Sequence, residues 1–273
     1  MMRWLDSPAS DSQVPHRHRL WLYALSVLVM VFLVAPTLIV IPMSFSGSQY
    51  LQFPPSHWSW RWYEHYFSST EWLQATATSL KVAFFTMLLT TPISVMAAYG
   101  LFVSRMRVAR FVYLALITPM IVPVILIAIG AFYAYVKLSL LHTILGLVLA
   151  DTVLAIPLVL IVVSSGLKSC DMNQEMAARS LGASRLKAFL LVTLPQIRFS
   201  VITGALLAFL TSFDEVVVAL FISGGDHTTI TRKMFISLRD QIDPTITSIS
   251  TLMILVSTGL LVAAQLFGKP RDR

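Results

Sequence analysis

Three acidic side chains that could bind a cation lie in segments that are otherwise apolar: Asp151, Asp214 and Glu215. A charge at the centre of a membrane-spanning helix costs about 2.5–3.5 kcal/mol on insertion scales, so such residues need a role. Asp214 and Glu215 are adjacent, and neighbours on a helix point about 100° apart, so both can face a cavity only at its edges. Carboxylates form charge-assisted hydrogen bonds with ammonium groups. The sequence leaves two interpretations: a path for a cationic solute, or polar bonds to a neighbouring helix or subunit.

Patterns typical of catalysis or metal binding are missing from the sequence. The single cysteine, Cys170, excludes an internal disulfide and a cysteine-based zinc site. The only closely spaced histidines are in HRH at 16–18, within a basic tail, which favours solvated side chains over metal ligands. The chain has no GxxxxGK[ST] phosphate loop, no GxSxG and no HExxH. We therefore expect no catalytic residue, and no metal or cofactor bound by this chain.

The composition predicts an all-α integral membrane protein. Of the 273 residues, 56% are hydrophobic and only 12% are charged, and the mean hydropathy is +0.77. A soluble domain carries about 25% charged residues. Because a spanning helix needs about 20 mostly apolar residues, we expect six helices. They cover 21–43, 77–103, 110–135, 144–166, 200–222 and 247–267, and Pro119 and Pro123 are expected to kink the third.

The distribution of basic residues predicts which side of the membrane each loop faces. With the N-terminus in the cytoplasm, 14 of the 20 Lys and Arg residues fall in inside segments, as the positive-inside rule requires. We therefore read the net charge of +7 as a topology signal, with no nucleic-acid partner. The prediction is a cytoplasmic tail over 1–20, a six-helix transmembrane domain over 21–267 and a cytoplasmic tail over 268–273.

Two long segments are then expected outside the membrane. Residues 44–74 contain FPPSHWSWRWYEHYF, whose Trp and Tyr side chains favour the headgroup region. They serve as an interfacial anchor or as a docking surface for another protein. In residues 223–246, Met234, Leu238 and Ile242 recur every fourth residue, which predicts a short surface helix. Asp243-Pro244 then predicts the start of the sixth span.

The segment 168–198 is predicted to be a folded cytoplasmic loop with two short helices. Asp171 can cap the first helix, with Gln174 as its capping-box partner. Gly182 follows that helix where a left-handed residue is favoured, and Ser184 can cap the second. Leu186, Phe189 and Leu190 are expected to share one face of the second helix, and Pro195 marks the turn back to the membrane. Its small central residues suit either close approach of a partner or packing under the chain's own bundle.

The sequence of this loop resembles the EAA loop of ABC-transporter permeases. The residues that carry the resemblance are Ala177-Ala178, Leu181-Gly182-Ala183, Phe189 and Val192-Thr193-Leu194-Pro195. One position departs from the pattern: counting back from Gly182, the family's Glu falls on Met176, and the actual Glu175 lies one residue earlier. The resemblance implies a type I ABC-importer permease with a cytoplasmic coupling helix. It implies ATPase-coupling roles for Glu175, Ala177, Ala178, Leu181, Gly182, Ala183 and Pro195.

Other segments are similar to the spermidine/putrescine branch of these importers, namely 79–101, 210–224 and 230–255. The resemblance implies that the chain translocates a cationic solute from the periplasm across the bacterial inner membrane. It implies a dimer of ABC ATPases that holds ATP and Mg, a periplasmic solute-binding protein and a second homologous permease, with a heterodimer favoured over a homodimer. Asp214, Glu215 and Asp151 are then candidates for the substrate path. The alternatives are a permease for an opine, an amino-acid derivative, iron or sulfate, or a carrier that works without ATP.

Overall fold

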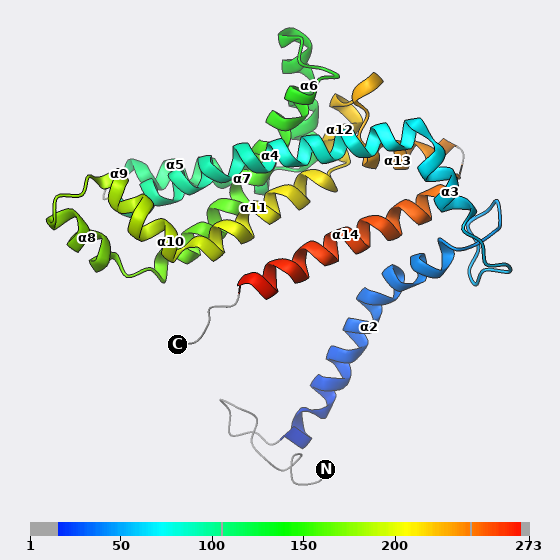
Figure 1. The fold of residues 1–273 in the computed structure, drawn as a ribbon, viewed down its shortest axis with the longest axis horizontal. Helices are drawn as coiled ribbons and strands as arrows, with labels where there is room; N and C mark the ends of the chain where they lie inside the picture. The colour runs from blue at the N-terminus through cyan, green and yellow to red at the C-terminus, as the bar shows by residue number, and fades with distance from the viewer. Residues whose placement is uncertain (1–15, 105, 241, 269–273) are drawn as a thin grey trace. The chain divides into compact units, whose positions relative to one another are not determined.

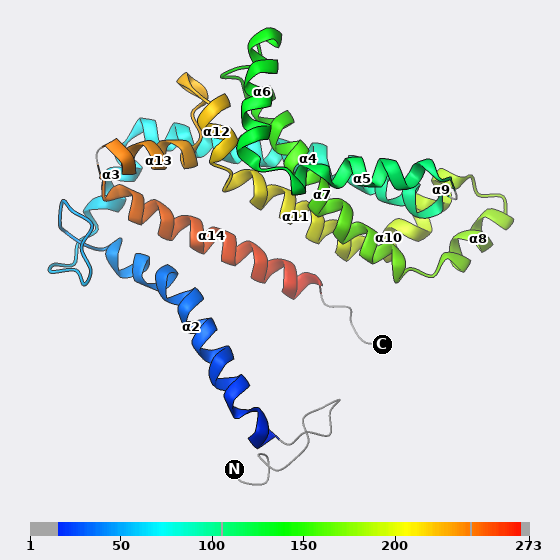
Figure 2. The same ribbon diagram turned by 180° about the vertical axis from the view of Figure 1, so that it is seen from behind.

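The computed structural model describes residues 16–104, 106–240 and 242–268, and nearly all of them are helical (Figures 1 and 2). Within these ranges the extended structure is one isolated β-bridge, between Ser46 and Trp58. The predicted tails lie largely outside the described residues, namely 1–15 and 269–273. The elements are η1 His16–Arg19, α2 Leu20–Met43, α3 Arg61–Ser68, α4 Thr70–Val103, α5 Val108–Ile121, α6 Val124–Leu138, α7 Ile144–Lys168, α8 Met172–Ser180, α9 Arg185–Ala188, the π-helical η2 Phe189–Thr193, α10 Leu194–Gln196, α11 Arg198–Phe213, α12 Val217–Ile222, η3 Gly225–His227, α13 Ile230–Asp240 and α14 Thr245–Gly268.

The chain forms two compact units, one of residues 1–65 and 243–254, the other of residues 66–242 and 255–273. In the first unit, α2 has no buried side chain, and Phe32 is 76% exposed. Such an apolar surface needs a lipid or protein covering. Polar bonds join the rest of this unit: the Ser44 and Tyr63 hydroxyls lie 2.7 Å apart, and the Ser248 hydroxyl donates to the Trp62 carbonyl at 3.3 Å.

The second unit is built on α4, α7 and α11, which pack along one another (Figures 1 and 2). Small residues allow the close approach: a Cβ added to Gly204 of α11 would lie 2.9 Å from Cγ1 of Val159 on α7. Val159 belongs to a buried cluster with Leu160, Val163 and Ala208. Close packing of small side chains is how helices associate where no water is available to drive them together.

Four of the predicted spans are continuous helices that are long and apolar enough to cross a membrane: α2, α4, α7 and α14. The start of α14 is close to the prediction, because Asp243 Oδ1 accepts from the Thr245 backbone N–H at 2.9 Å. The helix begins at Thr245, however, so Pro244 precedes its first residue. The predicted surface helix is α13, and it ends before Ile242.

The other two predicted spans are interrupted. The span predicted over 110–135 consists of α5 and α6, which meet at 102°, so the expectation of a kinked single helix is wrong. The span predicted over 200–222 consists of α11 and α12, with a break at residues 214–216. A second bend, of 80°, separates the helical segment Arg185–Gln196 from α11. Six crossings are present if each bent pair crosses once.

Candidate functional site

The loop between α7 and α11 folds as two short helices, as predicted. Asp171 Oδ1 accepts from the Asn173 backbone N–H at 3.0 Å and so caps α8. Gln174 Nε2 lies 3.5 Å from Asp171 Oδ2 and does not reach back to the Asp171 backbone as a capping box would. Gly182 follows α8 with φ +94°, the left-handed conformation that its position predicted. The Ser184 hydroxyl accepts from the Lys187 backbone N–H at 3.4 Å and caps α9.

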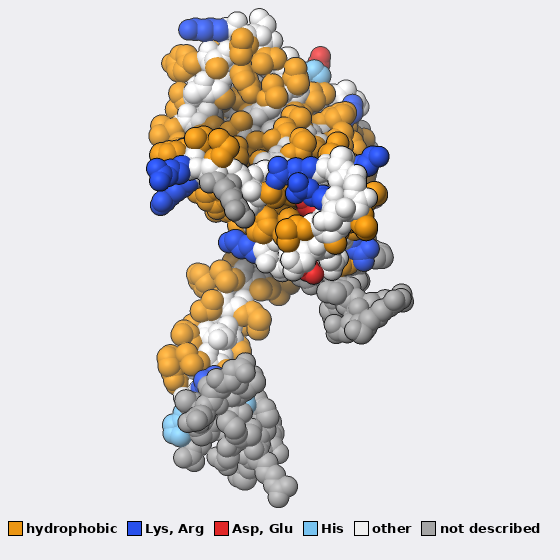
Figure 3. Space-filling model, turned by 90° about the vertical axis from the view of Figure 1, so that its left-hand side faces the viewer, with side chains coloured by type: hydrophobic (Ala, Val, Ile, Leu, Met, Phe, Trp, Pro, Cys, Tyr) orange, Lys and Arg blue, Asp and Glu red, His pale blue; other side chains and the backbone are white. Residues whose placement is uncertain are grey.

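The tip of the loop is open to a partner. Leu181 is 90% exposed, Gly182 and Ala177 are exposed, and a Cβ added to Gly182 would meet nothing within 4 Å. Ala178 and Ala183 are half-buried, and Pro195 is exposed beyond the second helix. Figure 3 looks onto this end of the second unit and shows Lys and Arg side chains around it. The exposed basic residues of the segment are Lys168, Arg179, Arg185, Lys187 and Arg198.

The apolar face expected on the second helix is buried at one residue only. Of the three residues expected to share that face, Phe189 is 7% exposed, whereas Leu186 is 67% and Leu190 is 47% exposed. The π-helical turn η2 begins at Phe189 and changes the register of the residues that follow, Leu190 among them. Phe189 and Thr193 are the buried residues of η2.

Glu175 points into the protein instead of toward the tip. It is 2% exposed and is the only buried residue of α8. The Tyr99 hydroxyl donates to Glu175 Oε1 at 2.6 Å, and the Thr193 hydroxyl donates to Glu175 Oε2. Met176, where the family pattern places its Glu, is 54% exposed. The one-residue offset in the sequence therefore corresponds to opposite environments: Glu175 is buried and Met176 is exposed. Sequence reasoning did not identify Tyr99 or Thr193 as hydrogen-bond partners of Glu175.

Cys170 lies next to this buried carboxyl group, between α7 and α8. Its thiol donates to the Gln196 side-chain oxygen at 3.2 Å. Partial burial raises the pKa of the Cys170 thiol, and the carboxylates of Glu175 and Asp171 raise it further. This cysteine is therefore a poor nucleophile, in agreement with a structural role.

The three candidate path acids differ in environment. Asp214 and Glu215 lie at the break between α11 and α12, not in a continuous helix, which corrects the geometry assumed for them from sequence. Asp214 is exposed, while Glu215 is half-buried and its Oε2 accepts from the Ala219 backbone N–H at 3.1 Å. Asp151 is 4% exposed on α7, and its Oδ2 accepts from the Ser212 hydroxyl at 2.5 Å. Of the three residues, Asp214 is the most exposed and Asp151 is buried.

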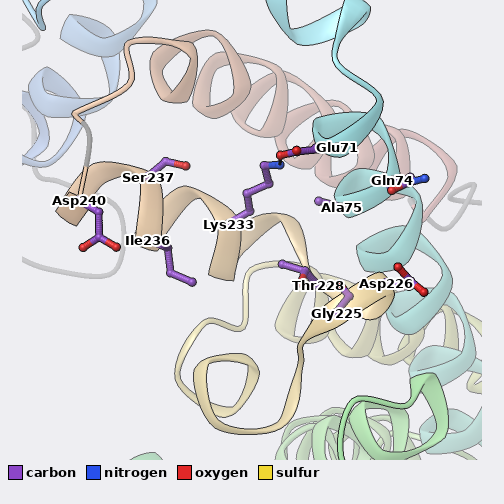
Figure 4. A pocket seen from close by; sticks show the side chains of 10 residues that line it. All are labelled: Glu71, Gln74, Ala75, Gly225, Asp226, Thr228, Lys233, Ile236, Ser237 and Asp240. Atoms are coloured by element: carbon purple, nitrogen blue, oxygen red, sulfur yellow. Dashed lines mark hydrogen bonds and ion pairs between the residues drawn. The ribbon is translucent and has the colours of Figure 1, made fainter.

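A cavity of about 490 Å³ lies near the N-terminal end of α4, and the sequence did not indicate it. Figure 4 shows α4, α13 and the η3 segment contributing its walls. Lys233 of α13 extends toward α4, where its Nζ lies 2.5 Å from Glu71 Oε2 and 4.9 Å from the Trp72 ring centroid. Asp226 and Asp240 add negative charge to the lining. Two polar contacts therefore join α4 to α13: this ion pair beside an aromatic ring, and a buried hydrogen bond from the Ile230 backbone N–H to the Ser79 hydroxyl at 2.8 Å.

The fold and the loop together define a class of protein: a membrane-spanning transport subunit whose folded loop is exposed at one end of a helical bundle. The chain belongs to the family described as binding-protein-dependent transport system inner membrane component, which matches residues 90–269. That match includes the whole of the loop. The protein is accordingly a multi-pass component of the inner membrane.

Proteins with similar sequences are named as permease proteins of transport systems. The spermidine/putrescine transport system permease protein PotC of Haemophilus influenzae is 29% identical over 249 residues, covering 91% of this chain and 96% of the relative. The putrescine transport system permease protein PotI of Escherichia coli K12 is 31% identical, covering 86% of this chain and 85% of the relative.

Solved structures show the same fold. A chain of a bacterial ABC transporter that imports alginate superposes with a TM-score of 0.69 at 17% identity, over 95% of this chain and 99% of the other. A chain of the MetNI methionine ABC transporter superposes with a TM-score of 0.61 at 15% identity, over 74% of this chain and 96% of the other. These likenesses confirm the predicted permease architecture.

Proposed function

We propose that this chain is one of the two permease subunits of an ATP-driven importer that moves a polyamine, spermidine or putrescine, into the cytoplasm. The observation that carries the proposal is the similarity, over most of the chain, to permease proteins that are named for spermidine and putrescine transport. A polyamine is a flexible chain with an ammonium group at each end. Carboxyl groups at a helix break can bind such groups through charge-assisted hydrogen bonds.

The energy for transport comes from other subunits. An ABC ATPase dimer that holds ATP and Mg docks on the cytoplasmic side, and residues Ala177 to Ala183 enter its groove. The exposure of Leu181 and Gly182 supports this contact. The second permease is in this proposal a homologous chain, and the two form a heterodimer. A periplasmic solute-binding protein delivers the solute, as the alginate importer's structure with its periplasmic protein illustrates for another member of this fold.

Reconstitution tests the function. The chain, its ATPase, its partner permease and its binding protein are placed in proteoliposomes, and uptake of radiolabelled putrescine and spermidine is measured with and without ATP. We expect uptake that needs both ATP and the binding protein. Uptake by this chain alone would favour the ATP-independent carrier. ATP-dependent uptake of an opine, an amino-acid derivative, iron or sulfate in place of polyamines would favour an ABC importer for that solute.

The path acids are tested in the same system. The double replacement Asp214→Asn and Glu215→Gln keeps the side-chain volume and removes the charge. We expect polyamine uptake to fall about tenfold, because a hydrogen bond to a charged group contributes roughly 1.5–3 kcal/mol. The matched control is Glu64→Gln, which neutralises an exposed acid on α3. Equal uptake by the double variant and the control would assign Asp214 and Glu215 a structural role.

The docking loop is tested at its glycine. Gly182→Arg places a long side chain at the exposed tip and at a positive φ, so we expect normal membrane insertion with ATP hydrolysis no longer coupled to uptake. Gly182→Asn is the matched control, because Asn adopts left-handed backbone conformations more readily than other non-glycine residues. Normal uptake by the Arg variant would contradict a docking role for the tip.

A further inference from the structure

The attachment of α8 to the rest of the second unit is polar. Its only buried residue is Glu175, so this helix of nine residues contributes no buried apolar side chain of its own. Helices this short are not stable in water without tertiary contacts. The hydroxyls of Tyr99 and Thr193 supply those contacts, one to each oxygen of the Glu175 carboxyl group. A buried carboxylate is costly without donors, so each hydroxyl has a clear energetic role.

The two donors come from two different elements. Tyr99 lies near the C-terminal end of α4, the helix that packs along α7 and α11. Thr193 ends the π-helical turn η2, which leads through α10 into α11. The ring of Tyr99 also packs on Phe189 of η2, with centroids 4.4 Å apart. One carboxyl group thus joins α8 to the core of the bundle by two routes.

We propose that the Glu175–Tyr99–Thr193 cluster is a mechanical latch, through which movement of the exposed loop is passed to α4 and α11. Glu175 is in this view a positioning residue of the transport cycle that touches neither the solute nor the ATPase. The exposed tip at Leu181 and Gly182 takes the force, and the latch transmits it. A second polar contact holds the start of α8, where the backbone N–H of its cap Asp171 donates to the Gln196 side-chain oxygen at 3.2 Å, but the Glu175 cluster is the attachment that is buried and that reaches α4. The inference rests on the proposed function, because it needs an ATPase to move the loop.

The first test measures coupling in the complete reconstituted transporter. Tyr99→Phe removes one donor and keeps the ring on Phe189, and Thr193→Val removes the other donor at nearly constant volume. We expect the ATP hydrolysed per solute imported to rise about tenfold in either variant, as loss of one hydrogen bond to a charged group allows. Tyr133→Phe, at a tyrosine of α6 that is 67% exposed, is the matched control and should leave the ratio unchanged. A loss of folded protein alone lowers the amount of transporter, not this ratio.

The second test needs no transport. Trypsin can cut after Arg179, which is exposed on α8, so the rate of cleavage in membranes reports how firmly α8 is held. We expect faster cleavage in Tyr99→Phe and Thr193→Val than in Tyr133→Phe. In a Glu175→Ala background, where there is no acceptor, Tyr99→Phe should add nothing. Wild-type coupling and wild-type cleavage in both donor variants would overturn the latch. A complex that imports no polyamine would contradict the proposed function while the cleavage rates still decide the latch.

Discussion

At the scale of single residues, Asp151 depends on a hydroxyl from another helix. Ser212 Oγ lies 2.5 Å from Asp151 Oδ2 and 3.4 Å from Thr86 Oγ1, which links α11, α7 and α4 in the bundle interior. Ser212→Ala leaves the carboxyl group buried without this donor. We expect the free energy of unfolding in detergent to fall by about 1–3 kcal/mol, the cost of an unsatisfied buried polar group.

Ser180→Ala on α8 is the control for that measurement. The Ser180 side chain is exposed and its hydroxyl donates only to the carbonyl of Met176, at 3.1 Å. Its replacement should change stability by no more than about 0.5 kcal/mol. If Ser212→Ala is as mild as this control, Asp151 has another partner and the hydroxyl bridge is not a determinant of packing.

The thiol of Cys170 gives a second prediction at this scale. Because its pKa is raised, a smaller fraction is thiolate near pH 8 than in a free cysteine, and the thiolate is the reactive form. We therefore expect maleimide to label Cys170 slowly, and the labelling rate to rise at a higher pH than it does for an exposed cysteine. The comparison is Cys170→Ser with Leu181→Cys, which moves the sole cysteine to a position that is 90% exposed. Labelling of Cys170 at the rate of the exposed cysteine would show that the burial and the neighbouring charges have no effect.

Single residues also show where sequence reasoning was limited. The caps at Asp171 and Ser184 and the left-handed Gly182 were predictable, because each depends on a side chain and its near neighbours. Glu175 was placed in the right loop, but its burial depends on Tyr99, 76 residues away in the sequence. Spacing within one helix gives no information on such a partner. The role of Glu175 as a direct ATPase contact remains a prediction. The hydrogen bonds from Tyr99 and Thr193 to its buried carboxyl group favour the role in the latch instead.

At the scale of elements, the close approach of α7 and α11 depends on the absence of a side chain at Gly204. A side chain there would meet Cγ1 of Val159 at 2.9 Å, and a β-branched neighbour has little freedom to move away. Gly204→Leu should therefore separate the helices and lower the free energy of unfolding by about 1–3 kcal/mol or more. The measurement is denaturant-induced unfolding in detergent. Gly130→Leu on α6 is the control, since an added Cβ meets nothing within 4 Å there, and equal effects at the two sites would contradict the close packing.

The helix breaks show how much of each element was predictable. Hydropathy located the apolar segments, because a bilayer tolerates few other sequences. The break after α5 follows from Pro123, which restricts the preceding residue, and Val122 is extended with φ −75° and ψ 132°. The break between α11 and α12 contains neither Gly nor Pro. There, the Glu215 backbone carbonyl accepts from the Thr231 hydroxyl of α13 at 2.6 Å, a tertiary contact that hydropathy does not encode.

At the scale of the whole molecule, the side of the membrane on which the loop lies depends on the α5–α6 pair. If the pair crosses, an N-terminus in the cytoplasm places residues 168–198 there too. If the pair returns to the side from which it starts, the loop lies in the periplasm and the ATPase cannot reach it. Four continuous spans and two bent pairs are compatible with either topology by length alone.

Contacts within the second unit favour crossing. The chain enters α5 just after the C-terminal end of α4. After α6 it reaches His142, whose backbone N–H donates to the Ile222 carbonyl at the end of α12 at 2.9 Å. After Ile222 the chain continues through η3 into α13, whose Lys233 pairs with Glu71 at the N-terminal end of α4. The two ends of the α5–α6 pair are thus near opposite ends of α4, as a crossing requires.

Cysteine accessibility tests this topology in a Cys170→Ser background. Ser139→Cys follows α6, Ser180→Cys is in the loop, and both positions are exposed. With a membrane-impermeant maleimide, we expect Ser139→Cys to label in intact cells and Ser180→Cys to label only after the cells are lysed. Ser56→Cys, in the exposed segment after α2, is the reference for the periplasmic side. The reverse pattern at 139 and 180 would mean that the pair re-enters the membrane, and it would separate the loop from any cytoplasmic ATPase whatever the solute.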